Sequence, residues 1–283
     1  MGIMSKVLVP VAAEDESELI CKFLAGMGAV GTRGAVLASV VDPNGVEPHE
    51  LAGELDIERE RFSGLAAGAI EAGIPTEIRI AAGETGEEIA RIAEADNVTG
   101  LVVGTHGRSA WAKLFAGSVS AELLTKVRLP MMLVRYELME NAADPAQLAR
   151  DFTQSIVVAC DFSTGSTVAV LALLGMELTR VGRVFLVHVL SPLLSGEELA
   201  EAEAGAVFQL KNEARMLQQA GVDAHVVIRQ GDPTRELLSE IDDRRCSGVI
   251  MGARGRSTLQ AAILGTKSGA VVETAPCPVI VIP

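Results

Sequence analysis

The sequence predicts an α/β fold of two tandem domains, each a doubly wound, five-stranded parallel sheet. Three observations support this prediction. The string GTHGRS at residues 104–109 recurs as GARGRS at 252–257, and each copy directly follows an apolar run. Short β-branched runs alternate with longer stretches of helical period along the whole chain. A chain of 283 residues, 49% of them hydrophobic, can bury the core of one large or two ordinary domains.

The two glycine strings belong to a repeat that spans most of the chain. When Gly104 is placed on Gly252, Arg108 and Ser109 fall on Arg256 and Ser257, and Pro130 falls on Pro278. Upstream, KVLVPV matches SIVVAC once a single residue is allowed to slip. Six glycines also coincide with six others: Gly73, Gly83, Gly100, Gly104, Gly107 and Gly117 fall on Gly221, Gly231, Gly248, Gly252, Gly255 and Gly265.

Each copy alternates strands and helices. The strands expected in copy one are VLVPV, AVLASVV, EIRIA, GLVVG and MMLVR, at 7–11, 35–41, 77–81, 100–104 and 131–135. Helical periodicity covers about 14–30, 49–72, 86–96 and 117–127. Copy two repeats this with SIVVAC, RVFLVHVL, AHVVIRQ, GVIMG and PVIVIP. Strands that are apolar throughout and separated by helices indicate parallel pairing with both faces covered.

The boundary between the copies is predicted in the acidic segment ELMENAADPAQLARDF, which lacks a strand pattern. Within it, Asp144-Pro145 is typical of an N-cap followed by proline at the first helical position, so a short helix is expected there. The predicted domains are residues 1–141 and 152–283.

Composition narrows the functional classes. The formal net charge is −13, which opposes binding to phosphate backbones and anionic membranes, so no nucleic-acid or membrane partner is expected. No apolar run of about 18 residues occurs, and acidic residues follow the N-terminus too soon for a signal peptide, so a cytoplasmic protein is expected. The four scattered cysteines are interpreted as buried hydrophobes.

The fourth strand of each copy leads into a candidate phosphate site. Copy one has Gly104-Thr-His-Gly107, nine residues, then Gly117-Ser118, and copy two has Gly252-Ala-Arg-Gly255, nine residues, then Gly265-Thr266. Glycines let a ligand approach the backbone, and a helix N-terminus offers free N–H groups to phosphate. The alternative is an ordinary turn in which Ser118 and Thr266 only cap helices. The repeated spacing favours phosphate binding.

At this point the sequence resembles the universal stress protein family in its tandem form, whose nucleotide-binding members carry this glycine pattern after the fourth strand. The resemblance covers nearly the whole chain, including the ending APCPVIVIP. It implies the strand order 3-2-1-4-5, two halves related by a pseudo-two-fold axis, and adenine-nucleotide binding in some members.

The resemblance also implies that the copies differ. Binding members carry an Asp after strand one, which copy two has in Asp161-Phe162-Ser163, whereas copy one has Ala12-Ala13-Glu14. The alternative for Asp161 is that it only caps the first helix. The nucleotide residues expected in copy two are Ala159, Cys160, Asp161, Phe162, Ser163, Val189, Gly252, Arg254, Gly255, Gly265, Thr266, Lys267 and Ser268. A weaker second site would use Pro10, Val40, Gly104, His106, Gly107, Gly117, Ser118, Val119 and Ser120.

The resemblance implies that the protein binds an adenine nucleotide, ATP or AMP, with or without Mg, as a regulator of the stress response. Lys267 could neutralise phosphate charge or block the pocket. No Walker loop, nucleophile elbow or metal motif occurs, so an enzyme is not expected. A slow ATP hydrolase and a dimerising scaffold with vestigial pockets stay open as alternatives. The expected assembly is a homodimer or an intramolecular pseudo-dimer.

Overall fold

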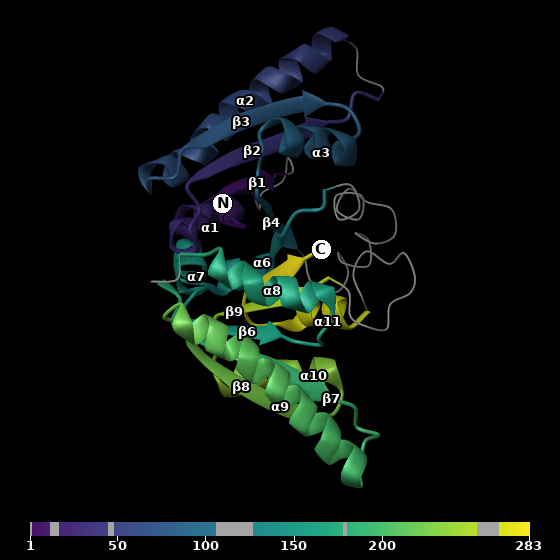
Figure 1. The fold of residues 1–283 in the computed structure, drawn as a ribbon. Coiled ribbons are helices and arrows are strands. Elements are labelled where there is room, and N and C mark those ends of the chain that lie inside the picture. Colours follow the sequence, from purple (N-terminus) through teal and green to yellow (C-terminus); the bar gives the residue numbers. More distant parts are fainter. Residues whose placement is uncertain (1, 12–16, 45–47, 106–126, 178–179, 254–265) are drawn as a thin grey trace. The chain divides into compact units, whose positions relative to one another are not determined.

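The chain folds as two compact units, Met1–Arg150 and Asp151–Pro283. The computed structural model describes residues 2–11, 17–44, 48–105, 127–177, 180–253 and 266–283. Figure 1 shows that each unit pairs a layer of strands with helices packed on its faces.

Unit 1 is a parallel sheet of order β3-β2-β1-β4-β5. Its elements are β1 (Lys6–Pro10), α1 (Ser17–Gly26), the 3₁₀ turn η1 (Met27–Val30), β2 (Gly34–Val41), α2 (Pro48–Glu71), β3 (Thr76–Ala82), α3 (Thr85–Ala95), β4 (Gly100–Thr105), β5 (Met131–Arg135), α6 (Tyr136–Asn141) and α7 (Pro145–Asp151).

Unit 2 repeats this order, with β8-β7-β6-β9-β10 all parallel. Its elements are β6 (Ser155–Ala159), α8 (Thr164–Leu174), β7 (Arg183–Leu190), α9 (Gly196–Gln219), β8 (Asp223–Gln230), α10 (Pro233–Asp243), β9 (Gly248–Gly252), α11 (Thr266–Thr274) and β10 (Val279–Ile282).

The predicted fold class is confirmed in both units, as is the order 3-2-1-4-5. The five strands expected in copy one form within one or two residues of their predicted ends. The predicted helix at 117–127 falls largely outside the described residues. The linker holds two short helices, α6 and α7, and Asp144 accepts a hydrogen bond from the Ala146 N–H at 2.9 Å. Helix α6 packs on α1, and α7 also lies against unit 1, since a Cβ atom at Gly26 would lie 1.9 Å from the Ala146 carbonyl oxygen.

The central strands form the core because helices cover both faces of each sheet. Val7, Leu8 and Val9 on β1 are completely buried, as are Ile156 and Val157 on β6. Helix α1 packs beside α2, and α10 packs beside α11. Right-handed crossovers place α8 and α9 on one face of unit 2 and α10 and α11 on the other. The four cysteines are buried and form no disulfide, as predicted.

Glycines that recur at the same place in both units are required there by the same backbone constraint. Gly73 and Gly221 end a long helix with positive φ values of 86° and 91°, a conformation that glycine adopts without steric cost. Gly100 and Gly248 begin the fourth strand where another segment presses close. A Cβ atom at Gly248 would lie 2.6 Å from the Phe152 ring and 2.7 Å from its carbonyl oxygen. The repeat in the sequence is therefore a repeat of backbone constraints.

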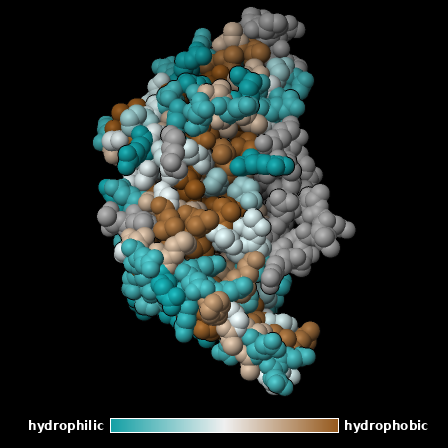
Figure 2. Space-filling view, viewed as in Figure 1, coloured by the Kyte–Doolittle hydropathy of each residue, from teal (hydrophilic) through white to brown (hydrophobic). Residues whose placement is uncertain are grey.

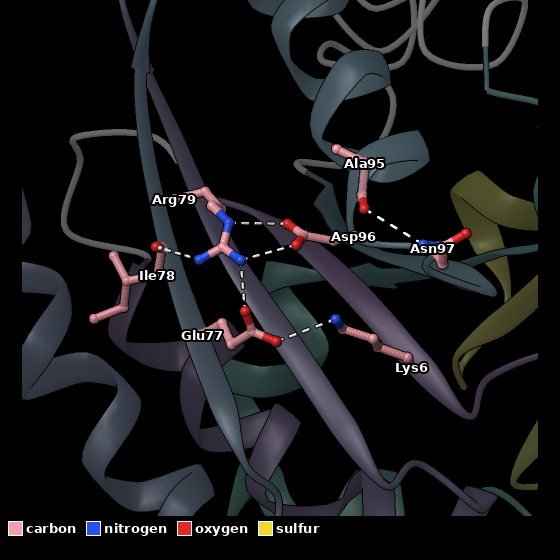
Figure 3. A network of polar contacts seen from close by, with 7 residues as sticks. All are labelled: Lys6, Glu77, Ile78, Arg79, Ala95, Asp96 and Asn97. Carbon is pink, nitrogen blue, oxygen red and sulfur yellow. Dashed lines mark hydrogen bonds and ion pairs between the residues drawn. The ribbon is translucent and has the colours of Figure 1, made fainter.

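A network of charges ties the edge strand β3 to its neighbours in unit 1 (Figure 3). The Arg79 guanidinium donates to both carboxylate oxygens of Asp96, at 3.0 and 2.8 Å, and to Glu77 at 2.5 Å. Glu77 also accepts from Lys6 on β1 at 3.1 Å. The hydrogen bonds from Lys6 and Arg79 lower the pKa of the Glu77 carboxyl. Charged side chains on an edge strand also discourage pairing with another chain.

Unit 2 instead has a buried carboxylate. Glu240 on α10 is fully buried and is held by Arg229 on β8 and by Arg244, whose Nε lies 2.5 Å from Glu240 Oε2. The Arg244 guanidinium also lies 4.3 Å from the centre of the Phe185 ring on β7. These contacts compensate the cost of removing the carboxylate from water and fix α10 to the sheet.

The outer surface of α8 is unusual because its sequence, TGSTVAVLALL, contains no charge. Val168 and Leu171 are exposed on this helix, and Figure 2 shows hydrophobic surface there. In α1 the exposed face carries the ion pair of Glu18 and Lys22, at 2.7 Å. Among the described residues no helix is both long and apolar enough to cross a membrane.

We predict that Gly248→Ala lowers the free energy of unfolding by about 1 to 3 kcal/mol, because the added methyl group would press on buried Phe152. Gly205→Ala is the matched control. Gly205 lies in α9, where a Cβ atom meets nothing within 4 Å, so this change should stabilise by about 0.5 to 1 kcal/mol. Urea unfolding of both variants measures the two effects. A Gly248→Ala variant as stable as the parent chain would contradict the close approach.

Candidate functional site

The candidate site of unit 2 lies at the carboxyl ends of β6 and β9. These strands are neighbours, but the chain leaves β6 toward β7 on one side and reaches β9 only after β8. The connections that follow β6 and β9 therefore diverge to opposite faces of the sheet. In such sheets ligands bind at this reversal of strand order.

The segment after β6 forms a tight turn that starts helix α8. Asp161 Oδ1 accepts a hydrogen bond from the Ser163 N–H at 3.0 Å, and Ser163 Oγ accepts one from the Ser166 N–H at 3.2 Å. Ser163 is thus the N-cap of α8. Asp161 has a structural role in the turn that precedes this N-cap.

Phe162 is held in an uncommon conformation within this turn. Its φ is +60°, in the left-handed region that non-glycine residues seldom adopt. Its ring stacks on His188 of β7, with centroids 4.4 Å apart. His188 Nδ1 lies 2.6 Å from the Cys160 carbonyl oxygen, and since a carbonyl can only accept, Nδ1 carries the proton. The stack and this bond fix the shape of the edge between β6 and β7.

Cys160 connects the turn to helix α9. Its amide donates to the Val187 carbonyl at 2.8 Å, and its thiol interacts with the carboxyl group of Glu213 on α9. Burial, and then the charges of Glu213 and Asp161, raise the pKa of the Cys160 thiol well above its usual range, so the thiol stays protonated. Burial also raises the pKa of the Glu213 carboxyl. Oxygen Oε2 of Glu213 is buried and has no hydrogen-bond partner among the described residues.

The structure brings the end of β9 together with the starts of two helices. A Cβ atom at Gly252 would lie 3.0 Å from the backbone of Gly165 in the first turn of α8. Packing alone therefore explains why residue 252 is glycine, whether or not a ligand also approaches it. The hydroxyl of buried Ser268, in the first turn of α11, donates to the Gly252 carbonyl at 3.3 Å. The amino end of α11 is thereby fixed beside β9.

The remaining predicted residues of unit 2 divide into two groups. Ala159 ends β6, Val189 lies near the end of β7, and the Lys267 side chain is exposed at the start of α11. Arg254, Gly255 and Gly265 lie outside the described residues, as does the side chain of Thr266. Across the part of the chain that the structure describes, no group of three or more His, Cys, Asp or Glu side chains is placed to hold a metal ion.

Unit 1 keeps the backbone of this edge but changes its surroundings. The amide after Pro10 donates to the Ala38 carbonyl at 2.9 Å, like its counterpart in unit 2. A Cβ atom at Gly104 would lie 2.3 Å from the ring of Tyr136, which begins α6. Val40 lies near the end of β2. The other predicted residues of the second site lie outside the described residues: His106, Gly107, Gly117, Ser118, Val119 and Ser120.

A polar cluster occupies the space in unit 1 that corresponds to the His188 edge. Ser39 aligns with His188 when Lys6 is placed on Ser155, and its hydroxyl lies 3.3 Å from Glu58 Oε2 on α2. Glu58 also accepts from Arg61 at 3.1 Å, and Arg61 reaches the Ser17 hydroxyl on α1 at 3.5 Å. The two units thus share a backbone and differ in the side chains under this edge.

Three residues at these edges were not predicted from the sequence: His188, Glu213 and Tyr136. A signal for Glu213 exists, because Leu210, Ala214 and Leu217 form the buried stripe of α9, and Glu213 follows Leu210 by three residues on that face. His188 is a lone polar residue in the apolar run RVFLVHVL. Nothing in the pattern pointed to Tyr136, because its role depends on where α6 packs.

Comparison with known proteins shows relatives of one kind. Universal stress protein YxiE of Bacillus subtilis is 30% identical over 73 residues, which cover 26% of this chain and 49% of that protein. Universal stress protein Rv2005c of Mycobacterium tuberculosis is 26% identical over 187 residues, 64% of this chain and 60% of its own length. The chain therefore spans only about half of the length of such relatives.

A universal stress protein from Archaeoglobus fulgidus, with a solved crystal structure, has the same fold. The two structures superpose over 98% of each chain, with a TM-score of 0.75 and 22% sequence identity. A universal stress protein family protein from Arabidopsis thaliana, solved with AMP bound, matches 46% of this chain and 90% of its own, with 23% identity and a TM-score of 0.35.

The family assignment rests on the whole chain rather than on one motif. The model of the universal stress protein family matches twice, over residues 4–135 and 153–283. Each match corresponds to one of the five-stranded sheets and its helices. The chain therefore belongs to the universal stress protein family and carries its domain in two tandem copies.

Proposed function

We propose that this protein binds an adenine nucleotide at the edge of unit 2 where the strands have their carboxyl ends. In its nucleotide-bound form it acts as a regulator in the stress response. The observation that carries the proposal is the convergence of three segments at one reversal of strand order. The Asp161 turn, the end of β9 at Gly252 and the amino end of α11 are joined by hydrogen bonds and close packing.

The amino end of α11 suits the phosphates. The first N–H groups of a helix lack partners within the helix and carry the positive end of its dipole. The Ser268 hydroxyl is already engaged with the Gly252 carbonyl, so backbone N–H groups rather than this hydroxyl would make the main contacts. Exposed Lys267 is available to add positive charge without filling the edge. The sequence also places Gly255 and Gly265 in the loop before α11.

Unit 2 is the better candidate because its edge retains a carboxylate. Asp161 forms the turn after β6 and provides the negative charge that would meet the sugar of a nucleotide. In unit 1 the aligned residue is Ala12, and the carboxylate of Glu58 accepts hydrogen bonds from Ser39 and Arg61. We therefore assign one nucleotide site to each chain.

Binding without fast turnover fits the proposed contacts. Backbone N–H groups hold phosphate charge but neither activate a water molecule nor remove a proton. The sequence has no Walker lysine, which is a usual part of phosphoryl transfer. Occupancy of the edge would instead order the loops after β6 and β9 and change the surface presented to a partner.

We predict that calorimetric titration with AMP, the nucleotide of the plant structure, finds one site per chain, and that Asp161→Ala weakens it at least about tenfold. Asp161→Asn separates the two tasks of this residue. Its amide oxygen can still accept from the Ser163 N–H, so the turn is kept while the charge is lost. If the carboxylate contacts the nucleotide, Asn also weakens binding.

Ser163→Ala is the control, because it removes the N-cap of α8 but leaves the Asp161 carboxylate. Its effect should appear in stability, by about 1 kcal/mol, more than in affinity. Equal affinity in the Asp161→Asn variant and the parent chain, or two equal sites per chain, would contradict the assignment.

We further predict that Gly265→Val abolishes binding while the chain stays folded, because a side chain there would stand where phosphate must meet the backbone. A phosphate-release assay with ATP tests the enzyme alternative, which requires magnesium-dependent release at about one per second or more. Turnover at that rate, lost in Gly265→Val, would favour a hydrolase. A lack of thermal shift with ATP, ADP and AMP would favour a scaffold.

A further inference from the structure

One carboxyl oxygen near the proposed site has no hydrogen-bond partner among the described residues. The Glu213 side chain is half-buried, its carboxyl group interacts with the Cys160 thiol, and its oxygen Oε2 is buried and accepts no hydrogen bond from the described part of the chain. A buried acceptor without a donor destabilises a folded protein. This oxygen therefore lowers the stability of unit 2.

The position of Glu213 connects it to the proposed site. It reaches from α9 to Cys160, the residue between the end of β6 and Asp161. The Cys160 carbonyl in turn holds His188, which directly precedes Val189 on β7. Helix α9 packs on both β7 and β8. The unpartnered oxygen thus lies on the α9 side of the edge where Asp161 and Val189 were expected to meet a nucleotide.

We propose that Glu213 is a specificity-determining residue that accepts a hydrogen bond from the exocyclic amino group of the bound base. This inference rests on the proposed nucleotide site. A carboxylate oxygen accepts a hydrogen bond from an amino group of the base. If the base carries a carbonyl oxygen at the same position, two acceptors face each other and no hydrogen bond forms. A site built around a buried acceptor therefore selects bases with an amino donor and rejects their carbonyl analogues, because the polar groups would be left unpaired.

The selectivity of the parent chain is the first measurement. AMP and inosine monophosphate differ at one position of the base, which carries an amino group in AMP and a carbonyl oxygen in its analogue. We expect the full-length protein to bind AMP at least about tenfold more tightly. Calorimetric titration with each nucleotide measures this ratio.

Two variants of Glu213 then test its role. Glu213→Gln places an amide at the same position, and an amide can turn its NH₂ group toward a carbonyl oxygen. The ratio of the affinity for AMP to the affinity for inosine monophosphate should therefore fall toward one. Glu213→Leu removes the acceptor and should weaken AMP about tenfold while raising the melting temperature by about 4 °C, since the buried unpaired oxygen is gone. Opposite changes in affinity and stability are not expected of a residue with a purely structural role.

The gain in stability should also depend on pH. Burial raises the pKa of the Glu213 carboxyl in the folded chain. The folded state then holds the proton more tightly than the unfolded state, so the cost of this group grows as pH rises through the interval between the two pKa values. The extra stability of Glu213→Leu should be larger at neutral than at mildly acid pH.

Glu203→Leu is the matched control, because it makes the same chemical change at an exposed position of the same helix. It should leave the AMP affinity and the AMP preference unchanged. Parent-like affinity and preference in both Glu213 variants would overturn the role of Glu213 and leave the nucleotide site intact. A parent chain that binds AMP without discriminating against the analogue would also overturn it. If the parent chain binds neither nucleotide, the proposed function fails and this inference fails with it.

Discussion

The reversal of strand order at the central strand is the constraint on which the rest of each unit depends. In a parallel sheet every connection must cross from one end to the other, so all carboxyl ends gather at one edge. At β6 and β9 the connections part to opposite faces of the sheet. The turn at Asp161, the stack of Phe162 on His188 and the start of α11 are arranged around this one place.

The two units show which features this constraint fixes and which it leaves open. The backbone features recur, including the positive φ of Gly73 and Gly221 and the crowded starts of β4 and β9. The side chains under the edge do not recur. Unit 1 fills the space with an ion pair between Glu58 and Arg61, and unit 2 has an aromatic stack. Duplication preserved the scaffold while the chemistry of the two edges diverged.

The predictable features were those that leave a local pattern. Glycines at fixed spacing revealed the repeat, because only glycine tolerates the approach of Phe152 to β9 or the positive φ after a long helix. Continuous apolar runs identified the strands. The sequence left open whether Asp161 shapes a helix start or binds a ligand, since the two tasks use the same residue types. The contacts of Glu213 and Tyr136 depend on how helices pack across the sheet, and no local pattern encodes that packing.

The central strand also determines the order in which each unit can assemble. Lys6 on β1 contacts Thr99, at a separation of 93 residues, while Ser155 on β6 contacts Ser247, at a separation of 92. Loops of that length must close before the middle of either sheet has both of its neighbours, and such distant pairings slow folding. On the ribosome β1 and β6 must each wait with one edge unpaired until most of the unit has emerged. Strands of this composition are prone to aggregate during such an interval, so the chain is expected to be most vulnerable while it is being made.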